Sequence, residues 1–141
     1  MRLLILSVLA LVLAGCGAER AAGDRLGQIR AAGAIRIGVK ADSPPFGVET
    51  RGMRQGFDID VAQSLARRLG VEPVFVTVTS AERIPKIASG EVDIVVASMT
   101  QTRGRERHVD FSIPYFEDGP AILVRTGGGI TSYLQLGGRK L

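Results

Sequence analysis

The amino-acid sequence predicts an α/β fold in which helices flank a mostly parallel sheet. Residues 35–40 alternate apolar and more polar side chains, and residues 92–97 form an almost continuous apolar run; both patterns indicate strands. Between them, residues 56–70 repeat apolar side chains at helical spacing. Strands that alternate with helices along a chain pair in parallel, so these observations together indicate the α/β class.

The first strand is followed by a proline-rich turn. We expect this strand at 35–40, and the segment Asp42-Ser43-Pro44-Pro45 comes next. Proline restricts the backbone and lacks an N–H, so the chain must leave the sheet in an extended turn that presents Phe46. A polar stretch at 49–55, which contains Gly52, then resembles a hairpin-like loop.

Residues 56–70 are expected to form the main helix. Asp58 and Asp60 lie at its start, where carboxylates stabilise the helix dipole, and Gly70 suits a C-terminal cap. An acidic pair of this kind could also serve catalysis or bind a metal, but the capping role is favoured. The apolar stripe of this helix consists of Ile59, Val61, Ala62, Leu65, Ala66 and Leu69.

The remaining elements continue the alternation of strand and helix. A β-branched run at 74–79 predicts a strand, and a helix at 81–89 is opened by Thr79 and Glu82 in the spacing of a capping box. The strand at 92–97 has the composition of a strand buried on both faces of a parallel sheet. Three weaker elements are a helix near residues 26–31, a strand at 121–125 and the start of a short helix in the tail 130–141.

The N-terminal residues predict export. The chain is apolar from Leu3 to Ala14 with one interruption, which is shorter than the about 20 residues of a membrane span. The ending Leu13-Ala14-Gly15-Cys16 resembles the lipobox of bacterial lipoproteins, which implies that Cys16 is acylated and becomes the mature N-terminus. The alternative is an ordinary signal peptide with an incidental cysteine. Cys16 is the only cysteine, so no intramolecular disulfide can form.

Composition and charge exclude several classes of protein. The net charge is +4, but the Lys and Arg residues are dispersed and aromatic residues make up only 5% of the chain, so we do not expect a nucleic-acid partner. His108 is the only histidine and has no second His or Cys at a ligand spacing, which predicts a surface position and no metal site. No cofactor is expected.

Three stretches of the chain, in order, carry a resemblance to a known family. They read VKADSPPFG at 39–47, GFDIDVAQSLARRLG at 56–70 and VVASMTQTRGRERHVDFSIPYF at 95–116. They resemble solute-binding protein family 3, the periplasmic binding proteins for polar amino acids. The resemblance implies a periplasmic-binding-protein type II lobe that binds an amino acid outside the cytoplasmic membrane and delivers it to an ABC importer. In this fold two lobes close on a ligand at the carboxyl ends of the strands.

The expected ligand contacts follow the third strand. Ser98, Thr100 and Thr102 come directly after it, and Arg105 lies one helical turn beyond Thr102, whose hydroxyl could cap the helix that carries the arginine. A planar guanidinium can hold both oxygens of an α-carboxylate. The resemblance implies this role for Arg105, with Ser98 and Thr100 contacting the carboxylate and the ammonium group. A surface charge run is the alternative reading of Arg105.

Two further features of the resemblance concern the expected ligand site. It implies that Phe46 lines the apolar wall of the cleft. Gly104 stands where the family usually carries Glu, and its poor helix propensity could loosen the turn that aims Arg105.

The segment TSAERIP at 79–85 bears on the choice of ligand. It resembles the TSxNRIP of binders for acidic amino acids, which implies that Ser80 and Arg83 meet a side-chain carboxylate, and Lys40 could add a further charge. Separate cations for the two carboxylates of glutamate or aspartate make these the first choice. Relatives of other specificity share the motif, so the choice stays open.

The resemblance also implies a division of the chain. We expect a lipoprotein signal peptide at 1–15, a tether at 16–32, an incomplete first lobe at 33–126 and the start of a crossover at 127–141. The second lobe is expected to be absent, which predicts an unpaired sheet edge, marginal stability and weak binding.

The expected partners are an amino-acid ligand, an ABC transporter permease and the membrane that holds the N-terminal lipid. We expect a monomer, exported to the periplasm or the cell surface. The alternatives are a periplasmic enzyme on the same scaffold, such as a cell-wall lyase or a dehydratase, and a non-functional fragment. An enzyme would need a positioned pair of titratable groups in the cleft, and the sequence offers none, so no catalytic residue is expected.

Overall fold

The computed structural model describes residues 24–119 and 121–138 and separates into two compact units. The first unit ends at Asp110 and the second begins at Phe111. The predicted signal peptide at 1–15, the predicted lipidation site Cys16 and the rest of the predicted tether up to residue 23 lie outside the described residues.

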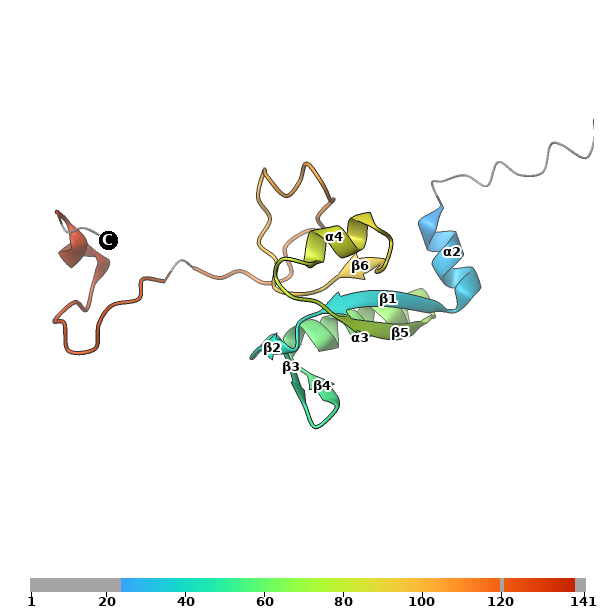
Figure 1. Ribbon diagram of the computed structural model, residues 1–141, viewed down its shortest axis with the longest axis horizontal. Coiled ribbons are helices and arrows are strands. Elements are labelled where there is room, and N and C mark those ends of the chain that lie inside the picture. The colour runs from blue at the N-terminus through green and yellow to red at the C-terminus, as the bar shows by residue number, and fades with distance from the viewer. Residues whose placement is uncertain (1–23, 120, 139–141) are drawn as a thin grey trace, which may run out of the picture. The chain divides into compact units, whose positions relative to one another are not determined.

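The first unit is built on a three-stranded parallel sheet with the order β5-β1-β6 (Figure 1). Its strands are β1 (Ala34–Val39), β5 (Glu72–Thr77) and β6 (Ile94–Val95), with β1 in the centre. Helices α3 (Phe57–Leu69) and α4 (Arg83–Ala88) connect them, so the strands and helices alternate as expected. The sequence-based prediction of an α/β fold with a mostly parallel sheet is confirmed.

A small antiparallel sheet branches off after β1. It contains β2 (Asp42–Ser43), β3 (Gly47–Thr50) and β4 (Met53–Gln55) in that order. The chain leaves the parallel sheet at the prolines, as predicted, and the Pro44–Pro45 peptide bond is cis. The hairpin predicted at 49–55 is confirmed: β3 and β4 pair around a turn at Arg51 and Gly52, both with positive φ.

Helix α3 packs its apolar stripe against the sheet. Gly56 precedes it with φ 130°, and a Cβ there would lie 2.3 Å from the carbonyl oxygen of Phe46, so only glycine fits at this entry. Gly70 ends the helix in the left-handed conformation, as predicted. Ile59, Ala62 and Ala66 are buried with the strand residues of β1, so the predicted stripe is confirmed.

Helix α2 (Arg25–Ala32) precedes β1 and belongs to the same core. Asp24 caps it by accepting a hydrogen bond from the N–H of Gly27 at 2.8 Å, and Gly33 ends it. Ile29 is buried in the core cluster that also contains Ile35, Ile37 and Val39. The helix predicted near residues 26–31 is therefore confirmed, and it contributes side-chain packing to the sheet.

Two strands differ in extent from the prediction. β5 begins at Glu72 rather than at residue 74, because the Glu72 N–H donates to the carbonyl of Gly33 at 2.9 Å and starts the ladder early. β6 covers only Ile94–Val95 of the predicted 92–97, although the N–H groups of Asp93 and Val96 also donate to β1. In both strands the parallel pairing to β1 sets the ends.

The second unit contains one short helical element among its described residues, the 3₁₀ helix η1 (Tyr133–Leu136). Ser132 and Gln135 form a capping box at its start, which confirms that the tail begins a short helix. The strand predicted at 121–125 is wrong: this segment has no ladder partner among the described residues, and Leu123 is fully exposed. An apolar run becomes a strand only where a neighbouring strand accepts its hydrogen bonds. No helix within the described residues is long and apolar enough to span a bilayer.

Candidate functional site

Polar side chains gather at the carboxyl ends of the three parallel strands, marked by the arrowheads in Figure 1. Lys40 directly follows β1, Ser80 comes three residues after β5, and Ser98 comes three residues after β6. Ligands of open α/β sheets bind at this edge, because the loops that leave neighbouring strands meet there.

Lys40 is held at this edge by two partners. Its side chain is largely buried, with 9% of the residue exposed, and Nζ lies 3.2 Å from Ser80 Oγ and 3.0 Å from Asp42 Oδ1. The ammonium group lowers the pKa of the Asp42 carboxyl below its usual value through this hydrogen bond. Ser80, one of the predicted site residues, is thus joined to the end of β1.

Arg83 is almost completely buried, with 7% of the residue exposed. Its Nε donates to the carbonyl of Ser80 at 3.1 Å, and one Nη donates to the carbonyls of Ala97 and Ser98 at 2.9 and 3.2 Å. Burial lowers the pKa of Arg83, and the positive charge of Arg105 lowers it further. Arg83 therefore ties the turn before α4 to the end of β6 with three of its five N–H groups.

Ser98 adopts a left-handed backbone conformation, with φ 48°. Its hydroxyl donates to Asp58 Oδ2 at 2.7 Å, and Asp58 is fully buried, with 0% exposed. The sequence placed Asp58 correctly in the first turn of α3 but missed this contact. A signal was available: Asp58 lies four and eight residues before Ala62 and Ala66, so helical spacing puts it on the buried face.

Arg105 lies half-buried on the loop after β6. One Nη donates to the carbonyl of Thr100 at 2.6 Å, and the Thr102 hydroxyl is 3.4 Å from the Arg105 backbone nitrogen. The predicted helix after Thr102 is wrong, because residues 103–108 form successive turns. Gly104, with its low helix propensity, lies within those turns.

Phe46 lies beside the N-terminus of α3. Its ring packs edge-to-face with Phe57, with the ring centroids 6.4 Å apart and the planes at 78°. The N–H of Asp58 donates to the Phe46 carbonyl at 2.9 Å. Phe46 is thus linked through Asp58 to Ser98, while Thr100 stays exposed on the loop that carries Arg105.

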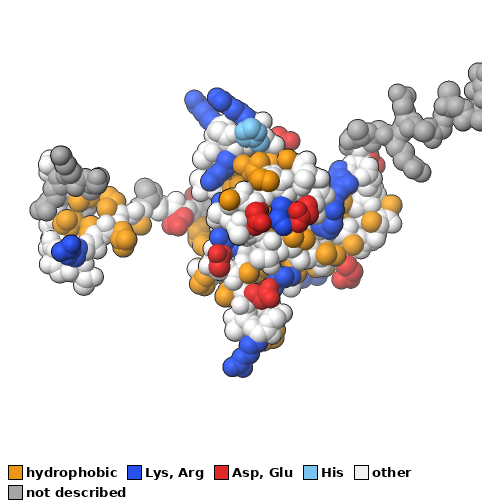
Figure 2. All heavy atoms as spheres, in the orientation of Figure 1, with side chains coloured by type: hydrophobic (Ala, Val, Ile, Leu, Met, Phe, Trp, Pro, Cys, Tyr) orange, Lys and Arg blue, Asp and Glu red, His pale blue; other side chains and the backbone are white. Residues whose placement is uncertain are grey.

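The loop at 101–108 is strongly basic. In Figure 2 its histidine, in pale blue, lies beside Lys and Arg side chains, and His108 is exposed as predicted. Within the described residues, no group of three or more His, Cys, Asp or Glu side chains could hold a metal ion.

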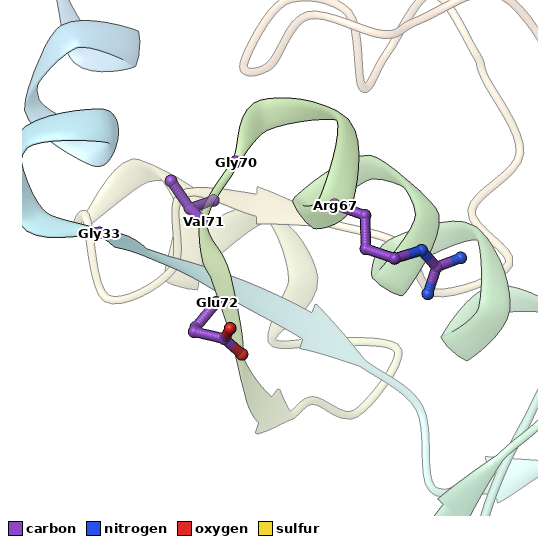
Figure 3. A pocket seen from close by; sticks show the side chains of 5 residues that line it. All are labelled: Gly33, Arg67, Gly70, Val71 and Glu72. Atoms are coloured by element: carbon purple, nitrogen blue, oxygen red, sulfur yellow. The ribbon is translucent and has the colours of Figure 1, made fainter.

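A shallow depression of about 290 Å³ lies at the opposite, amino-terminal end of the sheet. Figure 3 shows that the side chains of Arg67 and Glu72 do not converge on a common point there. The remaining lining comes from the ends of α2 and α3, at Gly33, Gly70 and Val71. Without convergent polar groups this depression is no candidate site.

Comparison with known proteins agrees with this geometry. The model of bacterial extracellular solute-binding proteins, family 3, matches residues 35–132. The chain is 40% identical to the ABC transporter glutamine-binding protein GlnH of Bacillus subtilis, over 96% of this chain and 55% of GlnH. It is 33% identical to the cyclohexadienyl dehydratase of Pseudomonas aeruginosa, over 84% of this chain and 44% of that protein.

A solved structure supports the same assignment. The arginine-bound form of domain 1 from TmArgBP superposes with a TM-score of 0.62 at 38% identity, over 72% of this chain and 75% of that chain. The chain spans about half the length of the curated relatives it matches. The fold is that of a type II periplasmic amino-acid-binding lobe, and the chain belongs to the bacterial extracellular solute-binding proteins, family 3.

Proposed function

We propose that this protein binds a polar amino acid at the carboxyl ends of its parallel strands. The observation that carries the proposal is the gathering of Lys40, Arg83 and Arg105 at this edge. Among the described residues, neither Arg83 nor Arg105 forms an ion pair with a carboxylate. Their positive charges are therefore left for an anionic ligand, and the α-carboxylate of an amino acid has the matching charge and planar shape.

In this proposal Arg105 holds the α-carboxylate. One of its Nη atoms is held by the Thr100 carbonyl, so the other N–H groups can form a paired contact with the two carboxylate oxygens. Ser98 has given its only hydroxyl hydrogen to Asp58, so its oxygen can accept a bond from the ligand ammonium group. Thr100 supplies a further polar contact, and Phe46 the apolar wall.

The ligand side chain that suits this corner is anionic. Arg83 keeps one Nη group beyond its three backbone bonds, and Lys40 and Ser80 stand next to it. A cationic side chain would be repelled by the same groups, since like charges in a partly buried site raise each other's free energy. We therefore propose glutamate or aspartate first, with glutamine, the ligand named for GlnH, as the neutral alternative.

Export and delivery complete the proposal. We propose that residues 1–15 are a signal peptide, that Cys16 carries a lipid anchor and that the residues between Cys16 and α2 tether the lobe to the membrane. Helix α2 packs on the core, so it belongs to the lobe and not to the tether. GlnH is named as part of an ABC transporter, which supports delivery of the ligand to a permease of that class. The protein would act as a monomer outside the cytoplasmic membrane, and residues 127–141 would lead toward a second lobe.

Calorimetry on the full chain tests the ligand. Glutamate, aspartate, glutamine and arginine are titrated separately, and the arginine-bound domain 1 of TmArgBP is a precedent for ligand binding by a single domain. The expected order is acidic above neutral above cationic. Tighter binding of arginine than of glutamate would contradict the anionic assignment, and absence of binding for all polar amino acids would contradict the function.

The relationship to a cyclohexadienyl dehydratase raises a second possibility, an enzyme on the same scaffold. Dehydration needs a general acid or base placed at the substrate. The carboxylates near this corner are committed elsewhere: Asp42 pairs with Lys40, and Asp58 accepts from Ser98. We propose a binding protein, and turnover of a cyclohexadienyl acid by the chain would overturn that.

A further inference from the structure

We propose that Asp58 is a positioning residue of the binding site, which holds Ser98 in its left-handed conformation and joins it to the Phe46 side of the cleft. The inference rests on the proposed function, because it assigns a task in ligand binding to a residue that does not touch the ligand.

The conformation of Ser98 requires an explanation. Left-handed backbone costs a non-glycine residue about 1–2 kcal/mol, and Ser98 is exposed, so packing does not force it into this shape. Its 2.7 Å hydrogen bond to the Asp58 carboxylate is charge-assisted and strong enough to offset a cost of that size. On the other side, Arg83 holds the Ser98 carbonyl at 3.2 Å.

Asp58 reaches both sides of the proposed cleft at once. Its carboxylate accepts from Ser98, and its backbone N–H donates to the carbonyl of Phe46 at 2.9 Å. The apolar wall and the corner after β6 are therefore connected through a single residue on α3, which is itself anchored by the core residues around it.

The burial of Asp58 argues against a role in helix capping alone. Asp60, in the same first turn, complements the helix dipole while exposed to solvent. Asp58 is completely buried, and burial of a carboxylate is unfavourable unless its hydrogen bonds compensate. Its contact with Ser98 supplies such a bond and leads to the ligand site.

Asp58 affects the proposed ligand site through the backbone of the loop after β6. Ser98 lies two residues before Thr100, whose carbonyl accepts from Arg105 at 2.6 Å. If Ser98 relaxes to a more common conformation, the Thr100 carbonyl moves, and Arg105 loses the support that aims its guanidinium. Asp58 thus acts on ligand affinity through the backbone.

Substitutions at Asp58 test this in the full chain, with affinity for the tightest-binding amino acid of the panel as readout. Asp58→Leu keeps the branching of the side chain at Cγ, adds some volume and removes the acceptor, and we expect about tenfold weaker binding. Asp58→Asn retains an acceptor oxygen and should stay within about threefold of the parent. Asp60→Asn is the matched charge control and should bind like the parent. Equal affinity of Asp58→Leu and the parent would overturn the proposal.

Substitutions at exposed Ser98 provide a second test that does not depend on folding of the Asp58 variants. Ser98→Ala and Ser98→Gly both remove the hydroxyl, but glycine adopts positive φ freely. We expect Ser98→Ala to bind about fivefold or more weaker than Ser98→Gly, because only alanine relaxes. Equal losses for the two variants would show that the hydroxyl acts by touching the ligand, and would overturn the positioning role.

A ligand-independent measurement separates this inference from the function. The three-bond coupling between the amide and α protons of Ser98 reports its φ angle in the free protein. It should change in Asp58→Leu and stay as in the parent in Asp58→Asn. An unchanged coupling in Asp58→Leu overturns the inference even where ligand binds, whereas a changed coupling with no binding to any amino acid contradicts only the proposed function.

Discussion

Arginines at the two ends of the parallel sheet have different kinds of partner. Near the amino-terminal end of β6, Arg25 and Arg36 both pair with the carboxylate of Asp93, which is 4% exposed. At the carboxyl end, Arg83 and Arg105 donate to backbone carbonyls. A carboxylate neutralises the charge of its partner, whereas a carbonyl holds the guanidinium in place and leaves its net charge unchanged.

The difference separates a structural cluster from a binding site. The carboxylate of Asp93 also accepts from the backbone N–H of Arg36 at 2.7 Å, and Arg25 brings α2 into the same group, so this cluster fastens α2 to the sheet. Arg83 and Arg105 at the other end are held by backbone carbonyls but are not neutralised. Such an arrangement is preorganised for an anion, since little reorganisation is needed when the ligand arrives.

The largest effect is expected from removing the charge at the carboxyl end. Arg105→Met keeps an unbranched apolar stem but removes the guanidinium and its paired contacts to the carboxylate. We expect ligand affinity to fall several hundredfold, or about 3–4 kcal/mol. Arg107→Met, on the same loop and exposed, serves as control and should bind within about twofold of the parent. Undiminished binding by Arg105→Met in calorimetry would remove the distinction between the two ends.

At the amino-terminal end we expect a loss of stability without a loss of ligand affinity. Asp93→Ala leaves two guanidinium groups and a backbone N–H without their acceptor, so the free energy of unfolding should fall by about 2–3 kcal/mol in urea denaturation. Ligand affinity of the folded variant should be unchanged, because the cluster lies away from the proposed site. Asp110→Ala, exposed, should change stability by less than about 0.5 kcal/mol. A loss of affinity without loss of stability in Asp93→Ala would contradict the comparison.

A smaller effect should appear on acidification. Hydrogen bonds from Arg36 and Arg25 outweigh the effect of burial and lower the pKa of Asp93 from 3.8 to about 2. A carboxyl with a lowered folded-state pKa stabilises the fold above its unfolded pKa. About 2 kcal/mol should therefore be lost as pH falls from about 4 to about 2. Urea midpoints across this range measure the loss. If the parent and Asp93→Ala lost the same stability on acidification, Asp93 would contribute nothing to the pH dependence.

Local patterns were sufficient for most of the first unit. The stripe of α3, the glycine that ends this helix and the alternation in β1 are each visible within a short segment, and the structure confirms them. The strand at 121–125 failed because its apolar pattern says nothing about whether a neighbouring strand is present to pair with it. The length of β6 also depends on its partner β1.

The candidate site was likewise predictable from the sequence only in part. The motifs around Ser80, Ser98 and Arg105 located the edge of the sheet where the polar groups gather. They did not show that Arg83 donates three hydrogen bonds to backbone carbonyls. Nor did they show that Asp58 accepts one from Ser98, 40 residues away in the sequence. Those contacts join segments that are distant in the chain.

By itself the sequence determined the class of fold, the family and the residue types at the carboxyl edge, because periodicity, turn chemistry and motifs are properties of short segments. Tertiary structure alone decided which charges are neutralised. Asp58 and Asp93 look alike as acidic residues beside apolar runs, yet one accepts from a serine in a strained turn and the other from two arginines. Coulomb energy and hydrogen bonding depend on distances in space, which are set only once helices and strands have packed.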